Sequence, residues 1–240
     1  TLAGGIAHDF NNILGGIMGY VELSLKHHIK PDNPATGYLK EVLHASIRAK
    51  DLVSQIVTFS RQTEQKRRPL NICPVIKESL KLLRASLPSN IEIHQHIDDM
   101  ESNILAEPTQ IQQVILNLCT NAYHAMGEKG GIIEISLNRV VFGSDDATVN
   151  PDIAQGVEYH ELTIRDTGHG IDPSIIDRIF DPFFTTKKTG EGTGLGLAVV
   201  YGIVRSYDGA ITVDSIPDKG TTFKIYFPAI KRFEEDAPPP

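Results

Sequence analysis

The chain has 240 residues, of which 40% are hydrophobic and 22% charged, and its formal net charge at pH 7 is −7. This composition excludes a disordered chain, and no apolar run approaches the roughly 20 residues that a membrane-spanning helix needs. Two cysteines, with no CxxC pair and no N-terminal signal peptide, favour a reducing cytoplasmic setting over a disulfide framework or a zinc site. The acidic balance argues against a nucleic-acid partner.

Apolar side chains in the first part of the chain recur twice at the spacing of one helical face. Residues 31–34, Pro-Asp-Asn-Pro, break the chain between the two runs. We therefore predict a helical hairpin. Two helices alone bury little, so we expect two hairpins to form a dimeric four-helix bundle. The first run is Ile6, Phe10, Ile13, Ile17 and Val21, and the second is Val42, Ala49, Leu52, Ile56 and Phe59.

The charge changes sign along the chain. Residues 1–69 carry 9 basic and 6 acidic side chains, whereas residues 70–240 carry 14 and 24. The change follows Pro69, which disfavours helix at the residue before it and is a plausible end to the second helix. We predict a domain boundary here. The expected division is a first domain over 1–69, a second over 70–232 and a linker-like tail over 233–240.

Helices and strands are mixed after this boundary, which predicts an α+β layer sandwich. The polar stretch 141–158 is longer than a simple strand connection, and the sequence assigns it no role. Apolar patterns predict helices over 75–87, 108–126, 175–179 and 195–207, and strands over 91–97, 131–142, 159–165, 210–215 and 222–227, the last two forming a hairpin.

A histidine near the start of the chain is the first candidate for chemistry. On a helical wheel His8 and Asn12 point away from the apolar stripe. The neighbouring Asp9 can accept a hydrogen bond from one imidazole nitrogen and leave the other as a nucleophile, which suits phosphoryl transfer onto nitrogen. The alternative is an ordinary exposed histidine on a charged helix face, and the pair alone does not exclude it.

Two polar motifs in the second domain are candidates for nucleotide binding. Asn117, Asn121 and His124 share one face of the 108–126 helix, and amide oxygens are hard ligands suited to Mg²⁺. Asp166 follows a strand beside two glycines that allow a ligand close approach, so its carboxylate is placed to accept from an exocyclic amine. The alternatives are solvated asparagines and an ordinary Asp-Gly turn.

A glycine-rich run over 190–197 opens a helix, so free backbone N–H groups and the positive end of the helix dipole face a bound phosphate. Neither the dinucleotide-binding nor the Walker context surrounds this run. Before it, residues 179–188 combine phenylalanines with Lys187 and Lys188, which is typical of a mobile lid with phosphate contacts. The alternative is core phenylalanines beside a solvated lysine pair.

Taken in chain order, these motifs resemble the conserved boxes of sensor histidine kinases, and the resemblance extends from His8 to about Phe227. It is closest to the branch with His-Asp-Phe-Asn-Asn, often found in hybrid kinases that carry a receiver domain. The corresponding segments are 8–12 for the H box, 117–122 for the N box, 166–170 and 192–196 for the two glycine boxes, 180–184 for the F box, and 220–223 for the segment closing the adenine pocket.

The resemblance implies a dimerisation and phosphoacceptor domain followed by an ATP-binding domain of the gyrase, Hsp90 and histidine kinase type. His8 would be autophosphorylated with Asp9 as general base, and the phosphoryl group would pass to an aspartate of a response-regulator receiver, separate or fused downstream. Asn12 matches a position that orients water for phosphatase activity on the regulator. The 240 residues would then be the catalytic core of a longer sensor protein.

The same resemblance assigns the ATP site. Asn121 would coordinate Mg²⁺ with help from Asn117, and His124 stands where many relatives carry a lysine or arginine. The adenine contacts would be Asp166, Gly168, Gly170 and Thr221, and the phosphate contacts Lys187, Gly192, Gly194 and Gly196.

Two other functions use the same pocket. A regulatory module that binds ATP without kinase activity does not need the His8 and Asp9 pair. An ATPase of this superfamily uses a carboxylate in the N-box helix, and residues 108–126 contain none. We expect no membrane contact from this segment, and the sequence leaves open whether the parent protein is membrane-anchored, what it senses, and whether phosphorylation is in cis or in trans.

Overall fold

The computed structural model describes residues 2–30, 33–60, 67–97, 101–143, 153–187 and 193–230, with the backbone alone for residues 2–9, 11, 48 and 50–60. The chain divides into two compact units. One comprises Thr1–Gln65 with Phe183–Leu195, and the other Lys66–Pro182 with Gly196–Pro240. None of the described helices combines the length and apolarity that crossing a membrane requires.

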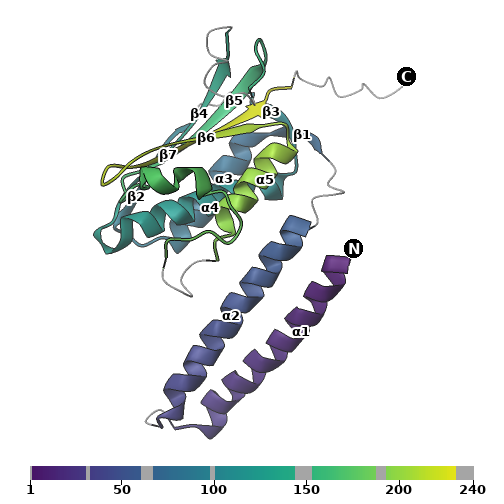
Figure 1. Cartoon of the computed structure of the whole chain (residues 1–240), viewed down its shortest axis with the longest axis vertical. Coiled ribbons are helices and arrows are strands. Elements are labelled where there is room, and N and C mark those ends of the chain that lie inside the picture. Colours follow the sequence, from purple (N-terminus) through teal and green to yellow (C-terminus); the bar gives the residue numbers. More distant parts are fainter. Residues whose placement is uncertain are drawn as a thin grey trace. The chain divides into compact units, whose positions relative to one another are not determined.

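The predicted helical hairpin is confirmed (Figure 1). Its helices are α1 (Leu2–Leu23), continued by a short π-helix η1 (Ser24–His28), and α2 (Ala35–Ser60). Within this unit the hairpin buries Leu14 and Val21 but leaves much of the apolar stripe in solvent. Phe10 is 53% exposed and Ile13 61% exposed. A second apolar surface is therefore needed to cover this face.

The second unit is built on a five-stranded sheet in the order β2-β4-β5-β7-β6. Only β2 and β4 pair in parallel, and the remaining neighbours are antiparallel. The predicted α+β sandwich is therefore correct. The strands are β2 (Ile91–Ile97), β4 (Gly131–Val141), β5 (Glu158–Asp166), β6 (Ala210–Ile216) and β7 (Gly220–Pro228).

Three helices cover one face of this sheet (Figure 1). They are α3 (Ile72–Ser86), α4 (Pro108–Met126) and α5 (Gly196–Ser206), with α4 packed between the other two. α4 presents fully buried Ile111, Val114 and Ile115. This continuous apolar stripe fixes the rotation of α4, and it directs the polar face away from the core.

Two predicted helices differ from the structure, and one short 3₁₀ turn was not predicted. The helix expected over 175–179 is a 3₁₀ helix, η4 (Pro173–Arg178), because Pro173 and the Asp172 cap start it early. α3 begins at Ile72 because the side chain of Asn71 accepts a hydrogen bond from the N–H of Cys73. A second 3₁₀ turn, η2 (Gly127–Lys129), follows α4.

Pro69 does not end a helix, and that prediction is wrong. It lies inside β1 (Arg68–Asn71), which pairs antiparallel with β3 (Asn103–Ala106) to form a separate small sheet. A two-stranded sheet has only edge strands, so a proline without an N–H donor is tolerated. Neither strand was predicted, because four residues are too few for a periodicity.

The open face of the large sheet is partly covered by the ends of the 141–158 connection. Phe142 packs edge-on against Tyr159 and Tyr226, with ring centroids 5.9 and 5.4 Å away. Ile153 and Val157 join this cluster. The described ends of the connection therefore form a small second core on this face.

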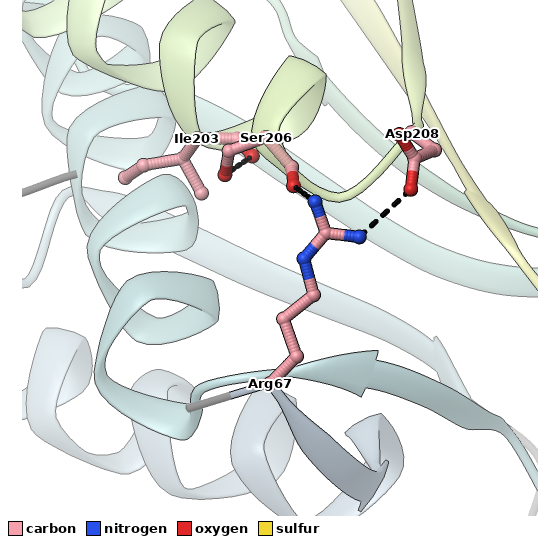
Figure 2. A network of polar contacts seen from close by, with 4 residues as sticks. All are labelled: Arg67, Ile203, Ser206 and Asp208. Carbon is pink, nitrogen blue, oxygen red and sulfur yellow. Dashed lines mark hydrogen bonds and ion pairs between the residues drawn. The ribbon is translucent and has the colours of Figure 1, made fainter. Parts of the chain in front are cut away.

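The first described residue after the first unit, Arg67, is tied to the end of α5 (Figure 2). Its guanidinium donates to the carbonyl of Ser206, the last residue of α5, and forms a 2.8 Å ion pair with Asp208. It also lies over the Tyr207 ring, 5.9 Å from the centroid. Tyr207 in turn accepts from the N–H of Glu107 and donates to Gln110, so Arg67, α5 and the start of α4 are linked.

Candidate functional site

The predicted N-box residues lie on the polar side of α4. Asn117 and Asn121 are partly buried, and His124 is exposed with its ring 5.2 Å from that of Tyr123. The side-chain amide of Asn117 donates to the carbonyl of Gly196 at 3.2 Å. A Cβ built on Gly196 would meet the Asn121 amide nitrogen at 4.0 Å. The structure therefore brings two asparagines together with the N-terminus of α5.

The bond from Asn117 constrains what that residue can offer a ligand. With its nitrogen committed to Gly196, its amide oxygen is the group left to act as an acceptor or a ligand. α5 starts at Gly196, so its first N–H groups lack intrahelical partners and favour an anion. The Asn117 amide oxygen, a hard ligand, thus lies next to a helix N-terminus that favours an anion.

Asp166 ends β5 and is 5% exposed. Its Oδ1 accepts from the N–H of Gly168 at 2.8 Å and from the N–H of Thr221 at 3.4 Å. Burial raises the pKa of this carboxyl, and the two backbone donors oppose that shift. A buried acidic group held by backbone donors is an oriented acceptor, which is what the reading of an exocyclic amine requires.

The first glycine box is bound to its surroundings on two sides. The N–H of His169 donates to the carbonyl of Ala125, one turn beyond Asn121 on α4. The N–H of Asp218 donates to the carbonyl of His169. Gly170 has a φ of +71° and approaches the backbone of Ile216 too closely for any side chain. The loop therefore connects the asparagine face of α4 to the β6–β7 turn.

Sequence reasoning missed one residue at this point, Ser215 on β6. Its hydroxyl contacts the N–H of Ile171, the carbonyl of Gly220 and the hydroxyl of Thr221. Thr221 is 4% exposed and faces Ser215 across the β6–β7 pair. A serine within a strand carries no motif, so only its register opposite Thr221 identifies it.

The part of the predicted lid from Phe183 onward is grouped with the first compact unit, and a backbone hydrogen bond joins Phe183 to Gly194. The N–H of Phe183 donates to the carbonyl of Gly194 at 3.0 Å. Both residues have positive φ, +68° and +65°. Lys187 is partly buried and its N–H donates to the Thr185 hydroxyl. Gly192 and Lys188 lie outside the described residues.

The predicted phosphoacceptor residues lie on α1. His8 and Asp9 are in this helix, but their side chains are outside the described residues. Asn12 is exposed one turn after His8. Across the described side chains, no group of three His, Cys, Asp or Glu residues could hold a metal ion. A metal at the predicted ATP site would therefore depend on amide oxygens and on the oxygens of the bound nucleotide.

Two family models match the chain. The model described as "Histidine kinase-, DNA gyrase B-, and HSP90-like ATPase" matches residues 106–231. The model described as "His Kinase A (phospho-acceptor) domain" matches residues 1–65. The two matches contain the ATP-site candidates and His8, respectively.

Similar proteins are sensor kinases. The chain is 37% identical to the sensor kinase CckA of Brucella abortus (strain 2308) over 99% of this chain and 25% of that protein. It is 33% identical to the sensor histidine kinase ZraS of Salmonella typhimurium, over 98% and 46% of the two chains. It is 31% identical to the sensory histidine kinase/phosphatase NtrB of Rhizobium meliloti, over 100% and 61%. The chain therefore spans between a quarter and about three fifths of these relatives.

Solved structures show the same fold. Full-length ShkA in complex with AMPPNP superimposes with a TM-score of 0.72 at 22% identity, covering 96% of this chain and 46% of that one. The histidine kinase ThkA in complex with the response regulator TrrA gives 0.62 at 22% identity, covering 95% and 61%. With the ATP-site motifs inside one family match and His8 inside the other, the chain belongs to the histidine kinase family, with a His Kinase A domain and an ATP-binding domain related to gyrase B and HSP90.

Proposed function

We propose that this chain is the catalytic core of a sensor histidine kinase that uses ATP to phosphorylate His8 and passes the phosphoryl group to an aspartate of a response regulator. One observation carries the proposal: a phosphoacceptor-domain match that contains His8 precedes, on the same chain, an ATP-binding-domain match with an oriented Asp166. The expected boundary after residue 69 lies close to the compact-unit division between Gln65 and Lys66, and we propose the latter as the boundary because Arg68 and Pro69 pair within the second unit as part of β1.

The reaction is a nucleophilic displacement at the terminal phosphorus of ATP. A ring nitrogen of His8 forms the new N–P bond, and the bond from that phosphorus to the bridging oxygen breaks with its electron pair leaving on ADP. The other ring nitrogen gives up its proton to Asp9, the neighbouring carboxylate. Catalysis then consists of positioning and charge stabilisation.

The ATP site would be assembled around the second half of α4, the start of α5 and the end of β5. Gly194 and Gly196 would receive the phosphates with Gly192 and Lys187, and His124 would add a contact that is stronger when protonated. Asp166 would accept from the adenine amino group, bounded by Gly168, Gly170 and Thr221. Its geometry as a buried acceptor supports that role.

Mg²⁺ fits these residues as a partner of the nucleotide. Mg²⁺ is bound through few protein oxygens together with phosphates and water, and Asn117 already holds its amide oxygen free of the Gly196 bond. Asn121 and Asn117 would hold the ion, which would supply neutralisation of the triphosphate charge. α4 itself contains no Asp or Glu, which agrees with a metal that arrives with ATP.

A homodimer follows from the exposed stripe on α1. Phe10, Ile13 and Ile17 are 53%, 61% and 39% exposed, and together they offer one helix face to a second copy. We expect Ile13→Glu to shift the chain toward monomer in sedimentation velocity. An unchanged dimer would contradict this use of the stripe.

The test of the kinase proposal is incubation with Mg²⁺ and ATP labelled on the γ-phosphate. We expect acid-labile, base-stable label on the chain, lost in His8→Ala while ATP binding persists. His27→Ala, which removes an exposed histidine of the same unit, serves as the control and should keep the label. Undiminished label in His8→Ala would refute the assignment. ATP binding or hydrolysis without any label in the unaltered chain would favour the regulatory module or the ATPase.

A phosphatase activity toward the phosphorylated regulator is a second candidate, favoured by the exposure of Asn12 one turn after His8. The relative NtrB is named a kinase/phosphatase. We expect Asn12→Ala to slow dephosphorylation of a regulator while His8 is labelled as before. Loss of the label would show that Asn12 serves the kinase step.

A further inference from the structure

The hydroxyl of Ser215 is the meeting point of three segments around Asp166. It accepts from the N–H of Ile171, at the end of the first glycine box, at 2.8 Å. It lies 3.1 Å from the carbonyl oxygen of Gly220 and 3.0 Å from the hydroxyl oxygen of Thr221. Thr221 is also the residue whose N–H reaches Asp166. Ser215 thus contacts Thr221, which reaches Asp166, and Ile171, which follows the first glycine box.

Counting protons fixes the direction of these bonds. The Gly220 carbonyl can only accept, so its bond requires the single proton of Ser215. The bond between the two hydroxyls then requires the proton of Thr221, and the N–H of Ile171 supplies the third. The opposite arrangement, with Ser215 donating to Thr221, leaves the Gly220 contact without a proton. All three bonds exist together only when Thr221 donates to Ser215.

We propose that Ser215 is a positioning residue for base recognition, which holds the Thr221 hydroxyl as a hydrogen-bond acceptor beside the Asp166 carboxylate. This inference rests on the proposed ATP site. With its proton committed to Ser215, Thr221 has only lone pairs to offer a ligand. Asp166 as a carboxylate is also an acceptor only, so the two side chains that face the base have the same polarity.

That polarity selects a purine with an amino group at position 6. A 6-amino group brings two N–H donors to two acceptors, whereas a 6-carbonyl group brings lone pairs to lone pairs. A buried acceptor facing another acceptor loses its hydrogen bond and is not compensated by water. Ser215 therefore strengthens the rejection of 6-keto purines by removing the one rotatable proton that could have paired with them.

The experiment compares Kd values for ATP and inosine triphosphate, which carries a carbonyl in place of the 6-amino group. We expect Ser215→Ala to weaken ATP binding about threefold and to strengthen inosine triphosphate binding about threefold, because the released Thr221 proton can pair with the 6-carbonyl, so that the selectivity ratio falls about tenfold. Ser215→Thr keeps the hydroxyl on a strand-compatible residue and should restore the ratio. Ser79→Ala, which removes a buried hydroxyl bonded within α3, should leave it unchanged.

A second background separates polarity from packing. In Thr221→Val there is no hydroxyl to orient, so adding Ser215→Ala should no longer change the selectivity ratio. The proposal is overturned if Ser215→Ala weakens both nucleotides equally, if Ser215→Thr fails to restore the ratio, or if Ser215→Ala still changes it in the Thr221→Val background. Failure of the unaltered chain to bind ATP would instead overturn the proposed function itself.

Discussion

Arg67, the first described residue of the second compact unit, offers a direct measure of how firmly that unit holds the start of its chain. Replacing Arg67 by Gln removes the 2.8 Å ion pair with Asp208 and the bond to the Ser206 carbonyl (Figure 2). It also removes the cation over the Tyr207 ring. All three contacts are made at the carboxyl end of α5. The substitution is therefore expected to loosen the end of one helix and to leave the sheet intact.

The magnitude follows from the exposure of the groups. The side chains of Arg67 and Asp208 are 46% and 74% exposed, so the ion pair itself contributes about 0.5 kcal/mol. The charged donor on a terminal helix carbonyl adds about 1 kcal/mol, and the cation over the ring about 0.5 kcal/mol. The sum of about 2 kcal/mol corresponds to a fall in Tm of about 4–8 °C for a unit of this size.

Scanning calorimetry of the whole chain measures this fall, and the transition that ATP raises identifies the ATP-binding unit. Arg165→Gln is the matched control, because Arg165 forms a single 3.4 Å ion pair with Glu134 on the exposed sheet face. It should lower Tm by less than about 2 °C. In the Asp208→Asn background, Arg67→Gln should lower Tm by less than it does in the unaltered chain. Equal shifts in Arg67→Gln and Arg165→Gln would refute the reasoning.

Two further substitutions test the nucleotide site. Burial raises the pKa of Asp166, so ionising this carboxyl costs the folded state more than it costs the unfolded chain, and stability is lost as pH rises above the ordinary carboxyl pKa. Asp166→Asn should therefore raise Tm at pH 7 without nucleotide and weaken ATP binding at least about tenfold, and a lowered Tm would contradict this. Gly194→Ala should weaken ATP binding at least about tenfold, because φ is +65° and the new Cβ would lie 2.6 Å from the Phe183 carbonyl oxygen. Gly37→Ala, which meets nothing within 4 Å, should leave binding unchanged and stabilise α2 by up to about 1 kcal/mol in chemical denaturation.

The long elements of the fold could be predicted because each buries a regular stripe. α4 shows this well, since its predicted bounds, Pro108 to Met126, are those found. The proline at its start and the glycine after its end set these bounds through local backbone preferences. β1 and β3 could not be predicted, because they are short, exposed in part and stabilised by pairing with each other across more than thirty residues. The misreading of Pro69 has the same origin, since local backbone preference does not indicate a partner strand.

The candidate site residues also fall into two groups, those that local sequence indicates and those that depend on distant contacts. Asp166, Asn117 and the glycines could be predicted as site residues because their chemistry is unusual for their local context, and the structure describes most of them without testing that role. Ser215 and Arg67 were missed as contacts because an isolated serine or arginine is ordinary in any sequence. Their significance comes from register, which places Ser215 opposite Thr221, and from the chain path, which brings Arg67 to the end of α5. Supporting residues of this kind become visible only when distant segments are in place.

Net charge was the weakest guide to the ligand. The segment from residue 70 onward is strongly acidic, with 14 basic and 24 acidic side chains, and would repel a polyanion in bulk. The sheet face explains how the charge is placed, because Glu134 and Glu161 lie there and pair with Arg165 and Lys224. The start of α5 carries no acidic residue in its first turn. N–H groups without intrahelical partners at that helix end act over a few ångströms, whereas the sheet-face charges are paired and screened by solvent, so we expect local donors to outweigh net charge at the proposed triphosphate site.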